Sequence, residues 1–217
     1  ASQSKSYVAL GGDRFFFNSV HIPSGKPCII ERMRSFEKEG RKFPREIKYL
    51  LMIQGGPGIP KLIDYFKMKD SDEIVWSTLV FEARDSLRFR DYYSQLNKER
   101  VRWIVYQLLK SLRFVHSQGL AHRDVKPPSL EVSSDFKQVW LLNWYFLERS
   151  EEELNYIFPL NKYVASRYFK SPELLLNCKR YDPAKLDMWG VGCVLAGMIF
   201  KEPFFRGQDL RDMLVKI

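Results

Sequence analysis

The spacing of hydrophobic residues changes from a strand-like to a helical period along this chain. In the first part, short runs of aromatic and β-branched residues predict strands, as over 14–17 and 26–30, with a Pro-Ser-Gly turn signal at 23–25 between them. One helical pattern interrupts these runs over 44–54. Residues 1–83 therefore predict a small, strand-rich domain that contains one helix.

The second part of the chain predicts helices. Between Asn97 and His116 the apolar residues fall three or four positions apart, and Gly119 ends the pattern. Asp182-Pro183 predicts the cap and first turn of a helix over 185–200, whose apolar residues on all sides indicate burial within protein. The most apolar window of this helix has thirteen residues, too few to cross a bilayer, so we expect no membrane partner. Residues 84–217 thus predict a helical domain, and the whole chain an α+β fold.

One segment carries candidate catalytic chemistry. Residues 121–127 read Ala-His-Arg-Asp-Val-Lys-Pro, and His-Arg-Asp with a Lys two positions later is the catalytic-loop pattern of protein kinases. In that pattern Asp124 accepts the proton of the substrate hydroxyl and Lys126 neutralises the transferred phosphoryl group. The pattern also needs an Asn and an Asp to hold magnesium, and this chain has Ser129 and Asn143 in those places. A hydroxyl and an amide bring no negative charge to a cation that prefers charged oxygen ligands.

Longer motifs make the resemblance more specific. The run at 163–175, Tyr-Val-Ala-Ser-Arg-Tyr-Phe-Lys-Ser-Pro-Glu-Leu-Leu, and the later Leu-Asp-Met-Trp at 186–189 and Glu-Pro-Phe-Phe at 202–205 resemble casein kinase II catalytic subunits. This resemblance covers nearly the whole chain. It implies a bilobal kinase-like fold, with a β-rich N-lobe over 1–83 that holds helix C near 44–54, and a helical C-lobe over 84–217.

In the resembled family the C-lobe runs on through further helices, and one of them supplies an Arg that pairs with the position of Glu173. We therefore expect a C-lobe that is incomplete after residue 217. Two explanations stay open: the chain is a fragment of a longer protein, or something else covers its open lower lobe.

The resemblance also places the nucleotide, and several positions depart from the family pattern. In the phosphate-binding loop Gly11 is the one glycine kept, and Arg14 replaces a small residue. Phe16 is expected to fill the adenine cavity; if the alignment shifts by one residue, it is an ordinary strand residue instead. Glu31 replaces the lysine that holds the phosphates, and it would repel both the triphosphate and Glu46 unless Lys26 or Arg32 compensates. The other positions concerned are the hinge residue Phe81, Glu131 beneath the adenine, and Tyr145 in place of a glycine.

Framework positions are kept while these chemical positions are lost. Asp187 is expected to anchor the backbone of the catalytic loop, and His122 with Trp144 to form part of an apolar spine. The pattern favours a catalytically impaired casein kinase II-like pseudokinase that acts as a scaffold or regulatory subunit, with no cofactor expected. One alternative is an atypical active serine/threonine kinase preferring acidic substrates, with ATP and with magnesium supported by Asn143, Glu148 or Glu131. Another is a basic component of a ribonucleoprotein.

Net charge and cysteine content indicate what kind of partner and which cellular compartment to expect. The net charge of +9 favours acidic partners. The resemblance assigns acidic-peptide contacts to Arg167 and Lys170, although Tyr163 stands where the family has a further Arg. It also suggests a casein kinase II regulatory-like subunit as a protein partner, with nucleic acid less favoured. Three cysteines without paired or metal-ligand spacing indicate a reducing compartment, so we expect a cytoplasmic or nuclear protein.

Overall fold

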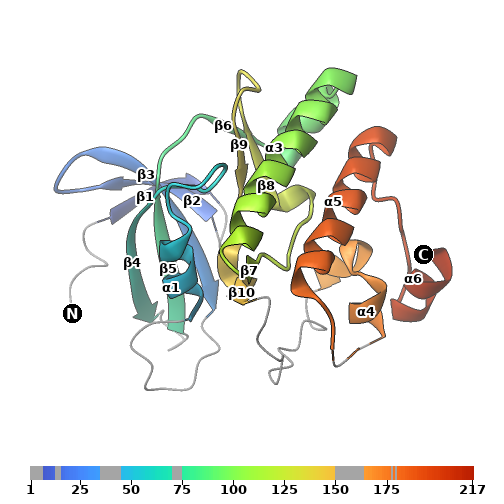
Figure 1. Cartoon of the computed structure of the whole chain (residues 1–217). Coiled ribbons are helices and arrows are strands. Elements are labelled where there is room, and N and C mark those ends of the chain that lie inside the picture. Colours follow the sequence, from blue (N-terminus) through green and yellow to red (C-terminus); the bar gives the residue numbers. More distant parts are fainter. Residues whose placement is uncertain are drawn as a thin grey trace. The chain divides into compact units, whose positions relative to one another are not determined.

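The computed structural model describes residues 7–12, 16–34, 45–69, 75–149, 164–176, 178 and 180–217 (Figure 1). The chain divides into two compact units. The first comprises Ala1–Gly55 with Pro60–Asp85, and the second comprises Gly56–Ile59 with Ser86–Ile217. Strands dominate the first unit and helices the second, so the expected α+β class is confirmed. The domain limits expected from the sequence, 1–83 and 84–217, stay predictions.

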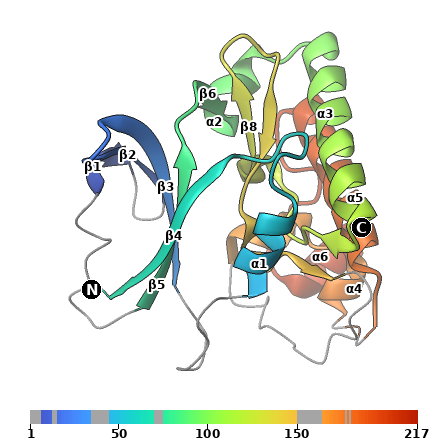
Figure 2. The same cartoon turned by 60° about the vertical axis from the view of Figure 1, so that its left-hand side comes forward.

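Five antiparallel strands form the sheet of the first unit, in the order β1-β2-β3-β5-β4 (Figures 1 and 2). They are β1 (Tyr7–Gly12), β2 (Phe16–His21), β3 (Lys26–Arg34), β4 (Leu62–Lys69) and β5 (Val75–Glu82). The helix expected over 44–54 is α1 (Arg45–Met52). The expected strand over 14–17 begins in the structure at Phe16, while residues 13–15 lie outside the described part of the chain.

The core of this unit follows the two-residue period of β3. Cys28 and Ile30 are buried with Phe66 and Val80 in one cluster, and Tyr7 stacks on Phe66 with ring centroids 5.8 Å apart. The Tyr7 hydroxyl donates to Oδ2 of Asp64 at 2.9 Å. Since alternate side chains of a strand point to opposite faces, Ile29 and Glu31 belong to the other face of the sheet, and both are buried there.

The second unit has fourteen elements among its described residues. They are β6 (Ser86–Arg88), α2 (Phe89–Tyr92), η2 (Tyr93–Gln95), α3 (Lys98–Ser117), β7 (Leu120–Ala121), η3 (Pro127–Ser129), β8 (Leu130–Ser133), β9 (Val139–Leu141), η4 (Trp144–Phe146), β10 (Glu148–Arg149), η6 (Val164–Phe169), α4 (Pro172–Leu175), α5 (Pro183–Phe200) and α6 (Leu210–Lys216). Strands pair in the orders β6-β8-β9 and β10-β7. The long helices α3 and α5 lie side by side (Figures 1 and 2).

Both long helices begin where their capping residues predict. The Asn97 side chain accepts a hydrogen bond from the backbone N–H of Arg100 at 2.8 Å and caps α3. The Asp182 side chain accepts from the backbone N–H of Ala184 at 2.9 Å, and Pro183 fills the first helical position of α5, where its missing N–H costs no hydrogen bond. The helices predicted over 97–116 and 185–200 are therefore confirmed.

The expectation that α5 is buried on all sides is wrong for one face. Met188, Ile199 and Phe200 are about half exposed, and the Phe200 ring lies against the Phe204 ring with centroids 5.2 Å apart. The helix also has 18 residues rather than the thirteen of its most apolar window. By length and composition α5 would be able to cross a membrane, but the core helices of soluble proteins meet the same test, and half of α5 is buried inside this unit.

Candidate functional site

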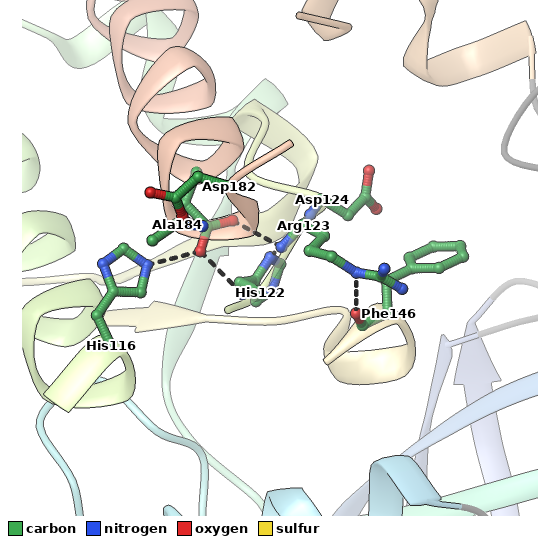
Figure 3. Close-up of polar contacts among 8 residues, drawn as sticks. His116, His122, Arg123, Asp124, Phe146, Asp182 and Ala184 are labelled. Atoms are coloured by element: carbon green, nitrogen blue, oxygen red, sulfur yellow. Dashed lines mark hydrogen bonds and ion pairs between the residues drawn. The ribbon is translucent and has the colours of Figure 1, made fainter. Parts of the chain in front are cut away.

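A single buried carboxylate holds the catalytic-loop backbone in place. Asp187 of α5 is fully buried and accepts hydrogen bonds from the backbone N–H groups of His122 at 2.8 Å and Arg123 at 2.6 Å. The imidazole Nε2 of His116, from the last turn of α3, lies 2.8 Å from the same carboxylate (Figure 3). The anchoring role expected of Asp187 is confirmed, because two adjacent backbone groups of the loop bond to one rigid helix.

The loop is also bound to the segment that follows β9. Nε2 of His122 lies 2.7 Å from the carbonyl oxygen of Leu142, and the His122 ring meets the Trp144 ring edge to face at 4.8 Å. Arg123 adopts a left-handed backbone conformation with φ of 66°, and its Nε donates to the carbonyl oxygen of Phe146 at 2.7 Å (Figure 3). These contacts fix the position of Asp124 relative to Asn143.

The two kept catalytic positions form a close ion pair. Nζ of Lys126 lies 2.6 Å from Oδ2 of Asp124, and both side chains are largely buried. Charge-assisted bonds of this length are stronger than neutral ones. Lys126 therefore holds the Asp124 carboxylate in a fixed orientation.

The two positions that the resemblance assigns to magnesium are bonded to each other. Ser129 is fully buried, and its hydroxyl donates to the backbone carbonyl of Asp124 at 2.7 Å while accepting from Nδ2 of Asn143 at 3.0 Å. Asn143 is in the left-handed region, with φ of 65° and ψ of 51°, which Asn adopts more readily than most residues. Ser129, Asn143 and the Asp124 carbonyl thus form a neutral hydrogen-bond chain. Within the described ranges no three or more His, Cys, Asp or Glu side chains gather in a way that would hold a metal ion.

A family model for the protein kinase domain matches residues 22–216. The chain belongs to the protein kinase family. The match covers most of both units, and the bilobal α+β kinase fold expected from the sequence is confirmed, with a β-sheet N-lobe and a helical C-lobe.

In this kinase domain Glu131 is buried with partners on a neighbouring strand. It lies on β8 opposite Arg88 of β6, with Nε of Arg88 3.7 Å from its carboxylate, and the Ser86 hydroxyl donates to the same carboxylate at 3.1 Å. The Glu131 side chain is 4% exposed. Arg88 and Ser86 cannot be recognised from the sequence as partners of Glu131, because a contact between residues more than forty positions apart leaves no local signal.

The first unit of the kinase domain holds the other altered nucleotide positions. Glu31 lies buried on β3 between Phe16 of β2 and Leu79 of β5, and Phe81 is buried opposite Ile29. Gly11 pairs with Asn18 beside an irregularity in β1. The side chains of Arg14, Phe16, Glu46, Tyr145 and Glu148 lie outside what the structure describes, so the expectations that involve them stay untested.

The Arg32 side chain, next to Glu31 in the sequence, lies against two aromatic rings. As the residue after Glu31 in a strand, it points to the opposite face of the sheet, where its guanidinium lies 4.9 Å from the Phe17 ring and 5.4 Å from the Trp76 ring. Lys26 is exposed at the start of β3, five residues before Glu31. Compensation for Glu31 by Lys26 or Arg32 stays a prediction.

The positions expected to contact acidic peptides are partly engaged within the domain. Nη1 of Arg167 donates to the carbonyl oxygen of Gln208. Lys170 is buried, and both this burial and the nearby Arg167 charge lower the pKa of its ammonium group. Tyr163 lies outside the described residues. Acidic-peptide contact through Arg167 and Lys170 stays a prediction, and burial of Lys170 reduces the charge it presents to solvent.

His122 is expected to make the domain sensitive to mild acid. Burial lowers the pKa of its imidazole below the ordinary value of 6.5. The backbone N–H of Asp124 donates to its Nδ1 at 3.2 Å, so this nitrogen must carry no proton. Near pH 6.5 the His122 imidazole therefore binds a proton in the unfolded chain but not in the folded chain. The contribution of His122 to the free energy of unfolding is fully present above that pH and is lost as the pH falls below it.

Urea unfolding between about pH 7 and 5 measures this effect, and His122→Gln is expected to flatten the pH dependence over that range. A decline that begins only below about pH 4, and that His122→Gln leaves unchanged, would assign the acid sensitivity to carboxylates instead.

Proposed function

We propose that this kinase domain is a catalytically impaired, casein kinase II-like pseudokinase that serves as a scaffold or regulatory subunit in a protein assembly. The observation that carries the proposal is the neutral hydrogen-bond chain from Asn143 through Ser129 to the Asp124 carbonyl. Its cellular setting is expected to be the cytoplasm or nucleus, and its partners are proteins, among them a casein kinase II regulatory-like subunit.

The chemistry of this chain argues against a bound magnesium ion. Magnesium prefers oxygen ligands in near-octahedral geometry, usually with one or two carboxylates. Here the Asn143 amide donates to the Ser129 hydroxyl, which donates onward to the Asp124 carbonyl, and neither side chain carries the negative charge that a carboxylate would bring to the ion. The residues present therefore do not fit the ion.

Two buried carboxylates argue against nucleotide binding. Glu31 stands at the position that the resemblance assigns to the phosphate-holding lysine, and Glu131 at the position assigned to the adenine contact. Negative charge in a poorly solvated site repels a triphosphate strongly. The ion pair between Glu131 and Arg88 would also have to be rearranged for an apolar base to pack there.

The kept contacts support a structural role. The catalytic loop is still held to α5 by Asp187, and to the segment after β9 by the contact of His122 with Trp144. These contacts hold the loop in place but take no part in phosphate transfer. A protein that keeps these contacts without the metal ligands supplies a shaped surface to its partners.

Thermal unfolding with ATP, in magnesium or in chelator, tests the proposal. We expect no magnesium-dependent rise of the midpoint, because a ligand raises it only if it binds the folded state. The matched gain-of-function variant Glu31→Lys/Ser129→Asn/Asn143→Asp restores the family residues and is expected to gain such a rise. Magnesium-dependent phosphorylation of an acidic peptide by the unaltered chain would overturn the proposal.

One observation favours an active kinase as the second candidate. Asp124 and Lys126 are both kept and lie 2.6 Å apart, in place to act on a substrate hydroxyl. Any phosphotransfer would then be abolished by Asp124→Asn. Activity that survives this substitution comes from a contaminating kinase and leaves the pseudokinase proposal standing.

A further inference from the structure

The exposed face of α3 carries an aromatic pair. Trp103 is 40% exposed and Tyr106 55% exposed, and their rings stack with centroids 5.7 Å apart and planes 30° apart. Leu109, one turn after Tyr106, is 37% exposed. Large apolar side chains that gather on one exposed helix face are typical of protein interaction surfaces, where Trp and Tyr contribute most of the binding energy.

Positive charge surrounds these rings. Arg102, Lys110 and Arg113 are exposed on the same helix, three or four positions from Tyr106 or from one another, so they lie along the same side. The one acidic residue of α3 is Glu99, in its first turn. Across the described residues no carboxylate forms an ion pair with Arg102, Lys110 or Arg113. The face is therefore aromatic and basic on balance: exposed Glu99 lies one turn before Arg102, whereas Lys110 and Arg113 lie farther along the helix from it.

The helix is a rigid base for this surface. Its opposite side, formed by Ile104, Leu108, Leu112 and Val115, is fully buried, and α3 packs along α5 (Figures 1 and 2). The backbone that carries these side chains is already ordered, so binding does not have to fix it, which favours affinity.

We propose that this α3 face docks an acidic protein segment that carries apolar side chains. The carboxylates would pair with Lys110 and Arg113, and the apolar side chains would pack on Trp103, Tyr106 and Leu109. This inference rests on the scaffold function proposed above and deepens it by giving the chemistry of a partner.

The ring geometry favours protein over nucleic acid as the occupant. Trp103 and Tyr106 cover part of each other's ring faces, which leaves less ring surface for the base stacking on which single-strand binding relies. Leu109 adds an aliphatic surface that suits an apolar side chain. Charge complementarity together with this apolar area points to an acidic, partly apolar peptide.

Fluorescence anisotropy tests the surface with a labelled peptide of Glu and Asp residues that has Leu at helical spacing. Lys110→Glu/Arg113→Glu is expected to weaken binding at least about tenfold. Trp103→Ala is expected to weaken it by a similar factor, since aromatic anchors dominate such contacts. The matched control is Lys185→Glu/Arg211→Glu, which makes the same charge change at exposed residues of α5 and α6 and is expected to leave binding unchanged.

Several outcomes would overturn the inference. These are no peptide binding, an equal loss in the control variant, equal binding of polyglutamate, or tight binding of oligouridylate that depends on Trp103. Phosphotransfer by the unaltered chain would overturn the pseudokinase proposal while leaving peptide binding on α3 intact, so the two failures are distinguishable.

Discussion

Replacement of Asp187 by Ala is expected to lower the free energy of unfolding by about 3–5 kcal/mol. The carboxylate is fully buried and accepts from the backbone N–H groups of His122 and Arg123 and from His116. Its removal leaves two backbone donors without their acceptor, and each unsatisfied buried group costs about 1–3 kcal/mol. The loss concerns the catalytic loop directly, so the loop is expected to lose its fixed conformation.

Urea unfolding followed by circular dichroism measures this loss. The control is Asp182→Ala, which removes a carboxylate five residues earlier that caps the same helix and is expected to cost only about 1 kcal/mol. Asp187→Asn should fall between the two, because an amide oxygen still accepts while the amide N–H₂ faces a donor. Equal losses for Asp182→Ala and Asp187→Ala would show that Asp187 contributes no more than an exposed cap.

Two glycines of α5 are expected to respond to alanine with opposite signs. A Cβ at Gly190 would lie 2.6 Å from the carbonyl oxygen and 2.7 Å from the Cβ of Val125, whereas a Cβ at Gly192 meets nothing within 4 Å. Gly190→Ala therefore forces the catalytic loop away from α5, at about 1–3 kcal/mol. Gly192→Ala is expected to stabilise the helix by about 0.5–1 kcal/mol, because Ala loses less backbone entropy than Gly.

The same unfolding experiment compares the two variants, and the difference between them is more informative than either value. Both remove a glycine from the same helix, so the effect of helix propensity is shared and only the contact with Val125 differs. If Gly190→Ala stabilised the domain as much as Gly192→Ala, the close packing of α5 on residue 125 would be refuted.

The parts of the fold that the sequence predicts depend on neighbours along the chain. Asn97 and Asp182 cap α3 and α5 because a capping side chain bonds to an N–H two or three residues later. The catalytic-loop pattern at 121–127 likewise depends on a short run of residues, and Asp187 was identified through a separate motif of the same family. These features could be predicted because each leaves its own local mark in the sequence.

The parts that could not be predicted depend on contacts between distant segments. The ion pair of Glu131 with Arg88 requires the pairing of β6 with β8, and the bond between Ser129 and Asn143 requires a particular backbone turn after β9. Burial of Lys170 and exposure of one face of α5 depend on which elements pack beside them. Residue type alone therefore indicates that the usual metal ligands are missing. It does not indicate which groups Ser129 and Asn143 contact instead.

The hydrogen-bond chain through Ser129 also bears on how long the folded protein lasts in a cell. A kinase site built from carboxylates carries like charges that repel one another until a cation arrives, so part of its stability follows the supply of nucleotide and metal. In this chain the neutral groups at 129 and 143 satisfy each other within the polypeptide. On the proposed function, turnover of this protein would be independent of cellular energy charge and would depend on whether its protein partners are present.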